Sequence, residues 1–292
     1  MANLKNTTVD DTGFFGIPSG TIYQRPVSPS TGMFRYNTDL NSEEYYTGTQ
    51  WVPTNLVPIV TTGLVVYLDA AEFLSYPRTG TVWKDLSGNG NNATLVNGPT
   101  FSTDGGGSLI FDGTDDSLSI ANSTSLQNTF STGSFSITST SKTNNLTYPK
   151  SSFPFWLETY VLNAGGAIGN RGLSSGDGSN ETSFTIEVNN GGTYYANNVP
   201  HTVSLSVPYV RTFVFDRSNG FTFRYYVNGV LLGEVGSASI TGSIYTSGGF
   251  SFGNMWGWMF SGTLYNLLIN AKALSSAEAL QNYHALRHKV GL

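Results

Sequence analysis

Short runs in which apolar and polar residues alternate fill most of the chain from about Leu56 onward. Strict alternation is typical of antiparallel strands with one buried face. The clearest alternating sets are Phe213/Phe215, Phe221/Phe223/Tyr225/Val227 and Val203/Leu205/Val207. We predict strands at Gly63–Ala70, Ser108–Gly113, Ser117–Ala121, Ser134–Thr138, Ser183–Val188, His201–Val207, Arg211–Asp216, Phe221–Gly229 and Leu264–Asn270. Many short strands separated by turn residues favour an all-β sandwich or jelly roll.

Residues 1–59 have a different pattern. They hold five of the 11 prolines and only three short strand-like pieces, which are Met33–Asn37, Glu44–Tyr46 and Gln50–Val52. Thr47-Gly48-Thr49 is predicted to be the hairpin loop between the last two pieces. Pieces this short bury little apolar surface alone. We therefore expect a small N-terminal segment over 1–59, containing a β-hairpin, and a larger domain over 60–292.

A helical pattern closes the chain. Ser275 and Glu278 have the spacing of a capping box. One apolar stripe follows at helical intervals and consists of Ala279, Tyr283, Leu286 and Val290. Gly291 suits the end of a helix, because glycine adopts the left-handed conformation found there. We expect a short C-terminal helix that packs against the sheet.

Composition narrows the choice of partner. Only 11% of the 292 residues are charged, and the net charge of −5 offers no basic surface for nucleic acid or an anionic membrane. With no cysteine, disulfides, thiolate catalysis and cysteine-ligated zinc are excluded. The first residues lack a basic stretch followed by an apolar one, and no run approaches the length of a membrane span. We expect a soluble protein made in a cytoplasm, without membrane insertion.

Several stretches of the larger domain resemble concanavalin A-like jelly rolls of the LamG/pentraxin type. They are GLVVYLDA (63–70), WKDLSGNGNN (83–92), NGPTF (97–101), FDGTDD (111–116), YYVNGVLLGEV (225–235) and FSGTLYNLLINAKALSSAEALQNY (260–283). The resemblance implies a jelly-roll sandwich of the kind found in bacterial surface and phage proteins. It carries over no specific ligand.

The N-terminal segment resembles virion appendages of tailed phages, notably cyanophages. The matching pieces are Gly16-Ile17-Pro18-Ser19-Gly20-Thr21, Gln24-Arg25-Pro26, Pro29, Gly32, Arg35-Tyr36-Asn37-Thr38 and Gln50-Trp51. This resemblance implies a homotrimeric virion component whose N-terminal segment contacts other virion proteins.

Catalytic groups are sparse. Because this fold also hosts glycoside hydrolases, we looked for two carboxylates two residues apart on a strand, and none occurs; Glu158, Glu181 and Glu187 are isolated. No nucleophile elbow is present. His284 and His288 have metal-binding spacing but lack the glutamate of the zinc-protease motif, so we interpret them as a solvated helix face. We predict that the protein is not an enzyme.

Carbohydrate binding remains, since sugars are held by flat aromatic faces and a few polar groups on loops. Two candidate sets are Trp256 with Trp258, and Tyr194 and Tyr195 with Asn197 and Asn198. The alternative is that the tryptophans are buried in the core, as most large aromatic residues are. The polar, glycine-rich stretch from Gly165 to Thr182 is predicted to be a variable recognition loop.

The acidic stretch FDGTDD (111–116) was compared with the ligand spacing of calcium-binding loops. Counted from Asp112, alternate positions hold Thr114, Asp116 and Leu118, and position twelve is Ser123, so the EF-hand template fails. Lectin-type sites draw ligands from separate loops, which leaves Asp115 or Asp116 as a candidate ligand; no other cofactor is expected.

Together these features predict a phage virion protein, exposed on the particle surface. As a tail or neck fibre or spike, its jelly roll would bind a host-surface glycan or receptor. A capsid decoration or head-fibre protein without a glycan ligand is the alternative, and a glycan-degrading enzyme the third hypothesis.

Overall fold

The computed structural model describes residues 16–38, 42–49, 51–54, 57–131, 133–145, 150–151, 155–157, 166–171, 181–190, 193–202, 204–218, 222–236, 249–255 and 258–292. For residues 22, 131, 150–202, 235–236, 254–255 and 258 within that set, only the course of the backbone is described. The chain forms two compact units, Met1–Leu56 and Val57–Leu292.

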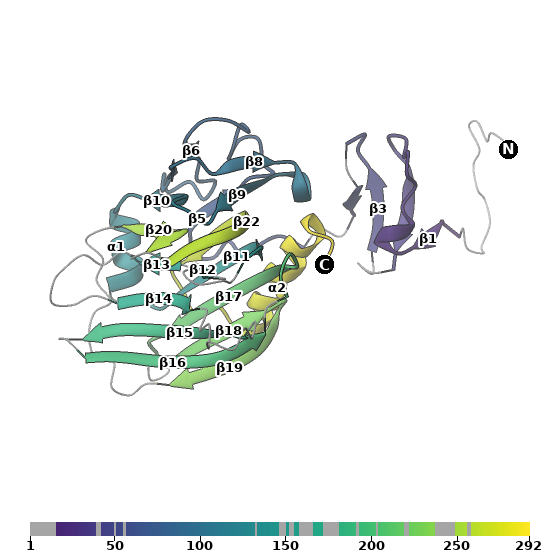
Figure 1. Cartoon of the computed structure of the whole chain (residues 1–292). Coiled ribbons are helices and arrows are strands. Elements are labelled where there is room, and N and C mark those ends of the chain that lie inside the picture. The colour runs from purple at the N-terminus through teal and green to yellow at the C-terminus, as the bar shows by residue number, and fades with distance from the viewer. Residues whose placement is uncertain are drawn as a thin grey trace, which may run out of the picture. The chain divides into compact units, whose positions relative to one another are not determined.

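The first unit is a four-stranded sheet in the order β1-β2-β3-β4 (Figure 1). Its elements are β1 (Ser19–Gly20), the 3-10 turn η1 (Ile22–Gln24), β2 (Phe34–Asn37), β3 (Ser42–Tyr46) and β4 (Trp51–Pro53). β1 pairs with β2 in parallel, and the other neighbours are antiparallel. The three predicted pieces therefore are strands, and Gly48 lies in the loop between β3 and β4 with a φ of 102° that favours glycine.

The second unit contains a ten-stranded sheet with the path β19-β18-β17-β11-β22-β9-β8; β5, β12 and β21 also pair with β22. These strands are β5 (Leu64–Asp69), β8 (Thr100–Ser102), β9 (Ser108–Asp112), β11 (Phe135–Thr143), β12 (Lys150–Ser151), β17 (Pro208–Asp216), β18 (Thr222–Val227), β19 (Val230–Gly236), β21 (Asn254–Met255) and β22 (Trp258–Asn270). β22 is the central strand of this sheet, because it pairs with β5, the first strand of the second unit, and also with β9 and β11.

A five-stranded sheet lies opposite, in the order β13-β20-β10-β7-β6. Its strands are β6 (Val82–Trp83), β7 (Ala93–Val96), β10 (Ser117–Ile120), β13 (Phe155–Leu157) and β20 (Phe250–Phe252). A three-stranded antiparallel sheet consists of β14 (Gly166–Arg171), β15 (Glu181–Asn190) and β16 (Thr193–Thr202), and β16 lies beside β19 (Figure 1). The remaining elements are η2 (Asp104–Gly106), α1 (Thr124–Ser131), α2 (Ser276–Leu286) and η3 (Arg287–Lys289).

The main core lies between the ten-stranded and five-stranded sheets, so the unit is a β-sandwich. Side chains from β5, β9, β11, β17, β18 and β22 meet side chains from β6, β7, β10 and β20 in one apolar cluster. The predicted inward set Phe213/Phe215 belongs to it, and so do three members of the second set, Phe223, Tyr225 and Val227; the fourth, Phe221, lies outside the described residues. Leu118 and Ile120 of β10 also point inward, as the alternation in FDGTDDSLSI indicates.

The prediction of half-buried strands is wrong for β17. Every residue from Val210 to Asp216 is buried, on both faces of the strand. The outer face is covered because Val214 packs with Val60, Leu274 and Ala279, and Val210 packs with the end of α2. The C-terminal helix and the segment before β5 thus form a third layer.

The capping box at Ser275 and Glu278 is present, but the buried face of α2 differs from the prediction. It consists of Ala279, Asn282, Ala285 and Leu286. The helix ends at Leu286 and continues as the tighter turn η3, which shifts later side chains off the predicted stripe. Asn282 is fully buried, and its Oδ1 accepts the backbone N–H of Val60 at 2.8 Å. The helix α1 was not predicted.

Two other strand and loop predictions are wrong. Ser204 to Val207 form a turn, with Ser206 at a φ of 61° and Leu205 40% exposed, so the predicted strand ends at Thr202. The predicted loop from Gly165 to Thr182 contains β14 and the start of β15; residues 172–180 lie outside the described residues. Neither α-helix in the described part of the chain is long and apolar enough to cross a membrane.

Candidate functional site

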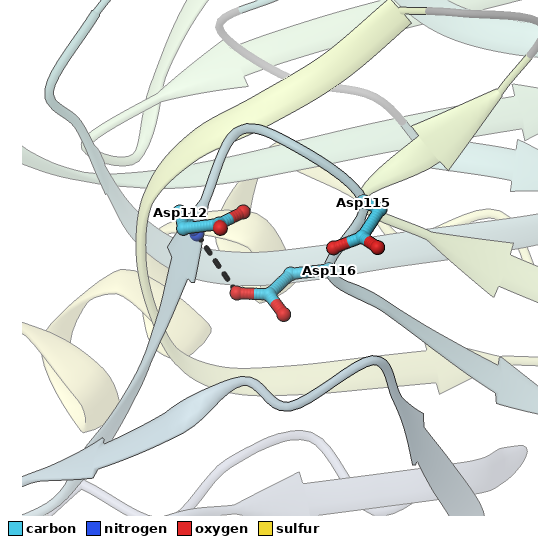
Figure 2. Close-up of side chains that lie close together, drawn as sticks. All are labelled: Asp112, Asp115 and Asp116. Carbon is cyan, nitrogen blue, oxygen red and sulfur yellow. Dashed lines mark hydrogen bonds between the residues drawn. The ribbon is translucent and has the colours of Figure 1, made fainter.

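The loop that joins β9 to β10 gathers three aspartates, as Figure 2 shows. Asp112 ends β9 and Asp116 immediately precedes β10. The backbone N–H of Asp112 donates to Asp116 Oδ2 at 2.9 Å, and the N–H of Thr114 donates to Asp112 Oδ1 at 2.6 Å. Gly113 has a φ of 76°, which lets the chain turn within this short distance. The loop is therefore held by its own carboxylates.

Electrostatics set Asp116 apart from its neighbours. Asp116 is only 5% exposed, whereas Asp112 and Asp115 are exposed. Burial raises the pKa of the Asp116 carboxyl above its ordinary value. The amide hydrogen bond from Asp112 opposes this change in pKa, and the negative charges of Asp112 and Asp115 add to it. Ionised Asp116 is thus held in an unfavourable environment.

One carboxylate oxygen from each of the three aspartates lies within 4.8 Å of the others. Carboxylate oxygens are the ligands that Ca²⁺ prefers, and a cation would relieve the repulsion between them. The sequence named only Asp115 and Asp116 as candidate ligands; the structure brings Asp112 to the same place. Ca²⁺ takes six to eight oxygen ligands, so these three residues supply part of a coordination sphere, and calcium binding stays a prediction.

The acidic loop lies beside the end of β20 and the early part of β22. Gly253, directly after β20, packs so closely that a Cβ there would lie 2.8 Å from the backbone oxygen of Asp116. β21 follows and forms a hairpin with the start of β22, pairing Met255 with Trp258. Further along β22, Ser261 pairs with Asp112. The hairpin and the acidic loop therefore begin at the same end of the sandwich.

Most of the predicted sugar-binding side chains lie outside the described residues. Trp256 is outside them, and Trp258 is described only as the first residue of β22. Tyr194, Tyr195, Asn197 and Asn198 lie within strand β16, described as backbone, so the expectation of a loop there is wrong. Their role in binding stays a prediction.

Of the three carboxylates considered for catalysis, two lie on one strand and the third is outside the described residues. Glu181 and Glu187 lie on β15, described as backbone, and Glu158 is outside the described residues. The histidines do not form a solvated helix face. His284 is half-buried beside Tyr283, and burial first, then the charge of Lys289, lowers the pKa of His288 to about 4.

Sequence reasoning missed a buried ionic cluster at the C-terminus. Lys289 Nζ pairs with Asp69, and the hydroxyl of Tyr67 donates to the same carboxylate at 2.9 Å. Burial and the charge of Asp69 raise the pKa of Tyr67 well above its usual range. A second, more exposed ion pair joins Lys142 to Asp104, and the Tyr265 hydroxyl donates to the same carboxylate at 2.7 Å. No local signal reveals such clusters, because their members are far apart in sequence.

The chain matches no protein-family model and no curated protein. Many solved structures are similar, among them two toxin binding domains and one domain of an arabinanase. The binding domain of Paraclostridial mosquitocidal protein 1 has 15% identity, a TM-score of 0.57 and coverage of 76% of this chain and 52% of that one. The binding domain of botulinum neurotoxin DC, solved with SialylT, has 13% identity, a TM-score of 0.57 and coverage of 77% and 52%.

The third is domain 4 of AbnA, an extracellular arabinanase of Geobacillus stearothermophilus, solved in complex with arabinotriose. It has 17% identity and a TM-score of 0.55, and the match covers 75% of this chain and 98% of that domain. The match spans about half the length of the two toxin chains. At these identities the likeness concerns the fold, and the chain has the jelly-roll β-sandwich fold of these binding domains.

Proposed function

We propose that the second unit is a carbohydrate-binding module whose recognition surface includes the acidic loop and the β21–β22 hairpin. The observation that carries the proposal is the packing of Gly253 against Asp116. This packing puts three carboxylates beside the end of β20, and the sequence that follows β20 contains two tryptophans. Carboxylates accept hydrogen bonds from sugar hydroxyls, and indole rings stack on sugar faces.

The fold supports a binding role in general, without identifying the ligand. Two of the similar structures were solved with the ligands SialylT and arabinotriose. Those ligands belong to those proteins, and no ligand carries over to this chain.

Binding without cleavage is favoured by the position of Asp116. A retaining glycosidase places two carboxyls about 5–5.5 Å apart on opposite sides of the bond that breaks. Here all three carboxylates come from one loop, and Asp116 is turned inward to accept the amide of Asp112. Three carboxylates on one loop can make polar contacts to one side of a bound sugar. They do not flank a glycosidic bond from two sides, as the acid and the nucleophile of a glycosidase do.

We infer further that the module is carried on a tailed-phage virion, as a fibre or spike. The support is the resemblance of residues 16–51 to virion appendage segments. In this proposal the first unit contacts other virion proteins and the jelly roll faces outward. A capsid decoration protein shares the N-terminal contact but has no glycan ligand, so a binding measurement separates the two.

The test is a glycan array probed with the full chain, followed by calorimetry on any glycan that binds, with and without 2 mM CaCl₂. We expect Trp258→Ala and Asp115→Asn to weaken binding at least tenfold. Glu234→Gln, which changes an exposed carboxylate on β19, is the matched control and is expected to bind as the native chain does. Absence of binding to all glycans and to host cells would refute carbohydrate recognition and favour the decoration role.

A further inference from the structure

The amine of Lys289 lies against two carboxylates at the end of β5. Its Nζ is 2.5 Å from Asp69 Oδ2 and 3.6 Å from Glu72 Oε1. The Asp69 side chain is buried, and most of the Lys289 side chain is covered. Keeping two opposite charges out of water is costly, and a neutral product at the same place avoids that cost. An amide between the amine and the Asp69 carboxyl is such a product.

The Asp69 carboxyl carries a hydrogen-bond donor on each oxygen. The backbone N–H of Ala71 donates to Oδ1 at 3.0 Å, and the Tyr67 hydroxyl donates to Oδ2 at 2.9 Å. Attack on the carboxyl carbon moves negative charge onto one oxygen, where an N–H donor stabilises it. The other oxygen must leave as water and needs a proton donor. Burial and the charge of Asp69 raise the pKa of Tyr67, so its hydroxyl stays protonated.

Glu72 provides a proton acceptor for the amine. An ammonium group has no lone pair, so Lys289 must lose a proton before its nitrogen can attack. Glu72 contacts Nζ on one side, and its own side chain is 56% exposed. A proton taken from the amine can therefore pass on to water.

The backbone holds both partners in position. Asp69 pairs with Asn266 in the central strand β22. A Cβ at Gly105 would lie 2.8 Å from the backbone oxygen of Lys289, so the end of the chain packs tightly there. Reacting groups held in contact behave as if at effective concentrations of about 10⁵–10⁸ M. Such concentrations favour a condensation that free amines and carboxylates do not undergo in water.

We propose that the folded chain joins Lys289 to Asp69 by an isopeptide bond, with the ion pair as its precursor. Glu72 takes a proton from the Lys289 ammonium, and Nζ attacks Asp69 Cγ. The Nζ–Cγ bond forms, the Cγ–Oδ2 bond breaks, and Tyr67 delivers a proton to the departing oxygen. The ammonium and the carboxylate thus become one amide and one water molecule. Glu72 and Tyr67 only relay protons and are regenerated.

The bond would close a loop from residue 69 to residue 289, which is almost the whole second unit. Covalent closure of a loop restricts the unfolded chain, as disulfides do. This chain has no cysteine, so an isopeptide bond would supply a cross-link that disulfides cannot.

A second ion pair in the same unit provides an internal comparison. Lys142 Nζ lies 2.5 Å from Asp104 Oδ2, and the Tyr265 hydroxyl donates to the same carboxylate. The Asp104 side chain is 48% exposed, and Lys142 forms no ion pair with a second carboxylate among the described residues. Without burial and without a proton acceptor, this pair is expected to stay ionic.

Intact-mass spectrometry of the full chain, denatured after increasing times at pH 7, measures the reaction. We expect the native chain to become lighter by one water molecule. A tryptic digest is expected to contain a branched peptide that joins residues 36–78 to residues 288–292. Lys289→Arg keeps the positive charge but has no reactive amine, so its full mass is expected to remain. Lys142→Arg is the matched control and is expected to lose water as the native chain does.

Glu72→Gln tests the proton acceptor. Glutamine fills the same place but takes no proton from the amine, so we expect water loss at least about tenfold slower. A succinimide at Asp112-Gly113 also costs one water molecule, but it leaves no branched peptide. A native chain that keeps its full mass overturns the proposal, and so does water loss without the branched peptide. An unchanged rate in Glu72→Gln overturns the role of Glu72.

Discussion

Lys289, in the last turn of the chain, is ion-paired with Asp69 at the end of β5, 220 residues earlier. The Asp69 side chain is 1% exposed and that of Lys289 15%. The backbone N–H of Ala71 and the hydroxyl of Tyr67 also donate to this carboxylate. The pair therefore connects the first and last elements of the sandwich.

Replacing Lys289 by methionine tests this connection. The change keeps the aliphatic stem but leaves Asp69 buried without its cation, and we expect a loss of about 3 kcal/mol in the free energy of unfolding. Urea denaturation monitored by tryptophan fluorescence measures it. Lys272→Met breaks the more exposed pair with Glu278 and is expected to cost less than about 1 kcal/mol. Equal losses in the two variants would contradict the argument.

The stability of the second unit is expected to fall as pH decreases from 6.5 to 4. Burial, followed by the charges of Lys289 and Arg287, lowers the pKa of His288 from 6.5 to about 4, and Asp69 only partly opposes this. The unfolded chain therefore takes up the proton first, and stability present above pH 6.5 is lost as pH falls. We expect His288→Gln to reduce the loss by about 2–3 kcal/mol. If the free energy of unfolding of the native chain and of His288→Gln falls in parallel as pH decreases, the loss does not come from His288.

Asp116→Asn is expected to stabilise the chain at pH 7 in the presence of EDTA. Because the folded-state pKa of Asp116 is raised, the unfolded chain releases this proton first, so stability is lost as pH rises above the ordinary value of 3.8 and the full cost is present once pH exceeds the folded-state pKa. Asparagine retains an oxygen that accepts the Asp112 amide and removes the charge, so the free energy of unfolding at pH 7 is expected to rise. Thermal unfolding at pH 7 measures the gain, and an unchanged or lower midpoint would count against it.

The same assay checks the calcium prediction. Binding to the folded state raises the unfolding midpoint with ligand concentration. We expect CaCl₂ to raise the midpoint of the native chain and to have little effect on Asp116→Asn. MgCl₂ is the control for ionic strength. No shift at 10 mM CaCl₂ would remove calcium from consideration.

Gly253→Ala probes the contact between the hairpin and the acidic loop. Gly253 has a φ of 103°, and a Cβ there would lie 2.8 Å from Asp116 O. Gly88 has a similar φ of 87° but nothing within 4 Å of its Cβ position. We expect Gly88→Ala to cost about 1 kcal/mol from backbone strain alone and Gly253→Ala about 2 kcal/mol or more. Calorimetric or denaturant unfolding compares them; equal costs would show that the close contact is unimportant.

The sequence by itself determined the features that depend on neighbours along the chain. Alternation located β10, β17 and β18 and their inward faces, because successive side chains of a strand point to opposite faces whatever lies beside it. The capping box located the start of α2, because its hydrogen bonds span three residues. The acidic loop was visible as three aspartates in five positions, which short-range turn geometry brings together.

Only the tertiary structure decided which distant segments pack against those strands and against α2. The burial of both faces of β17 depends on α2 and the segment around Val60, which are distant in sequence. The Lys289–Asp69 pair and the approach of Gly253 to Asp116 likewise depend on how β5, β10, β20 and β22 are ordered in the two sheets. Strand order is set by the combined burial of many residues, so no local pattern records it.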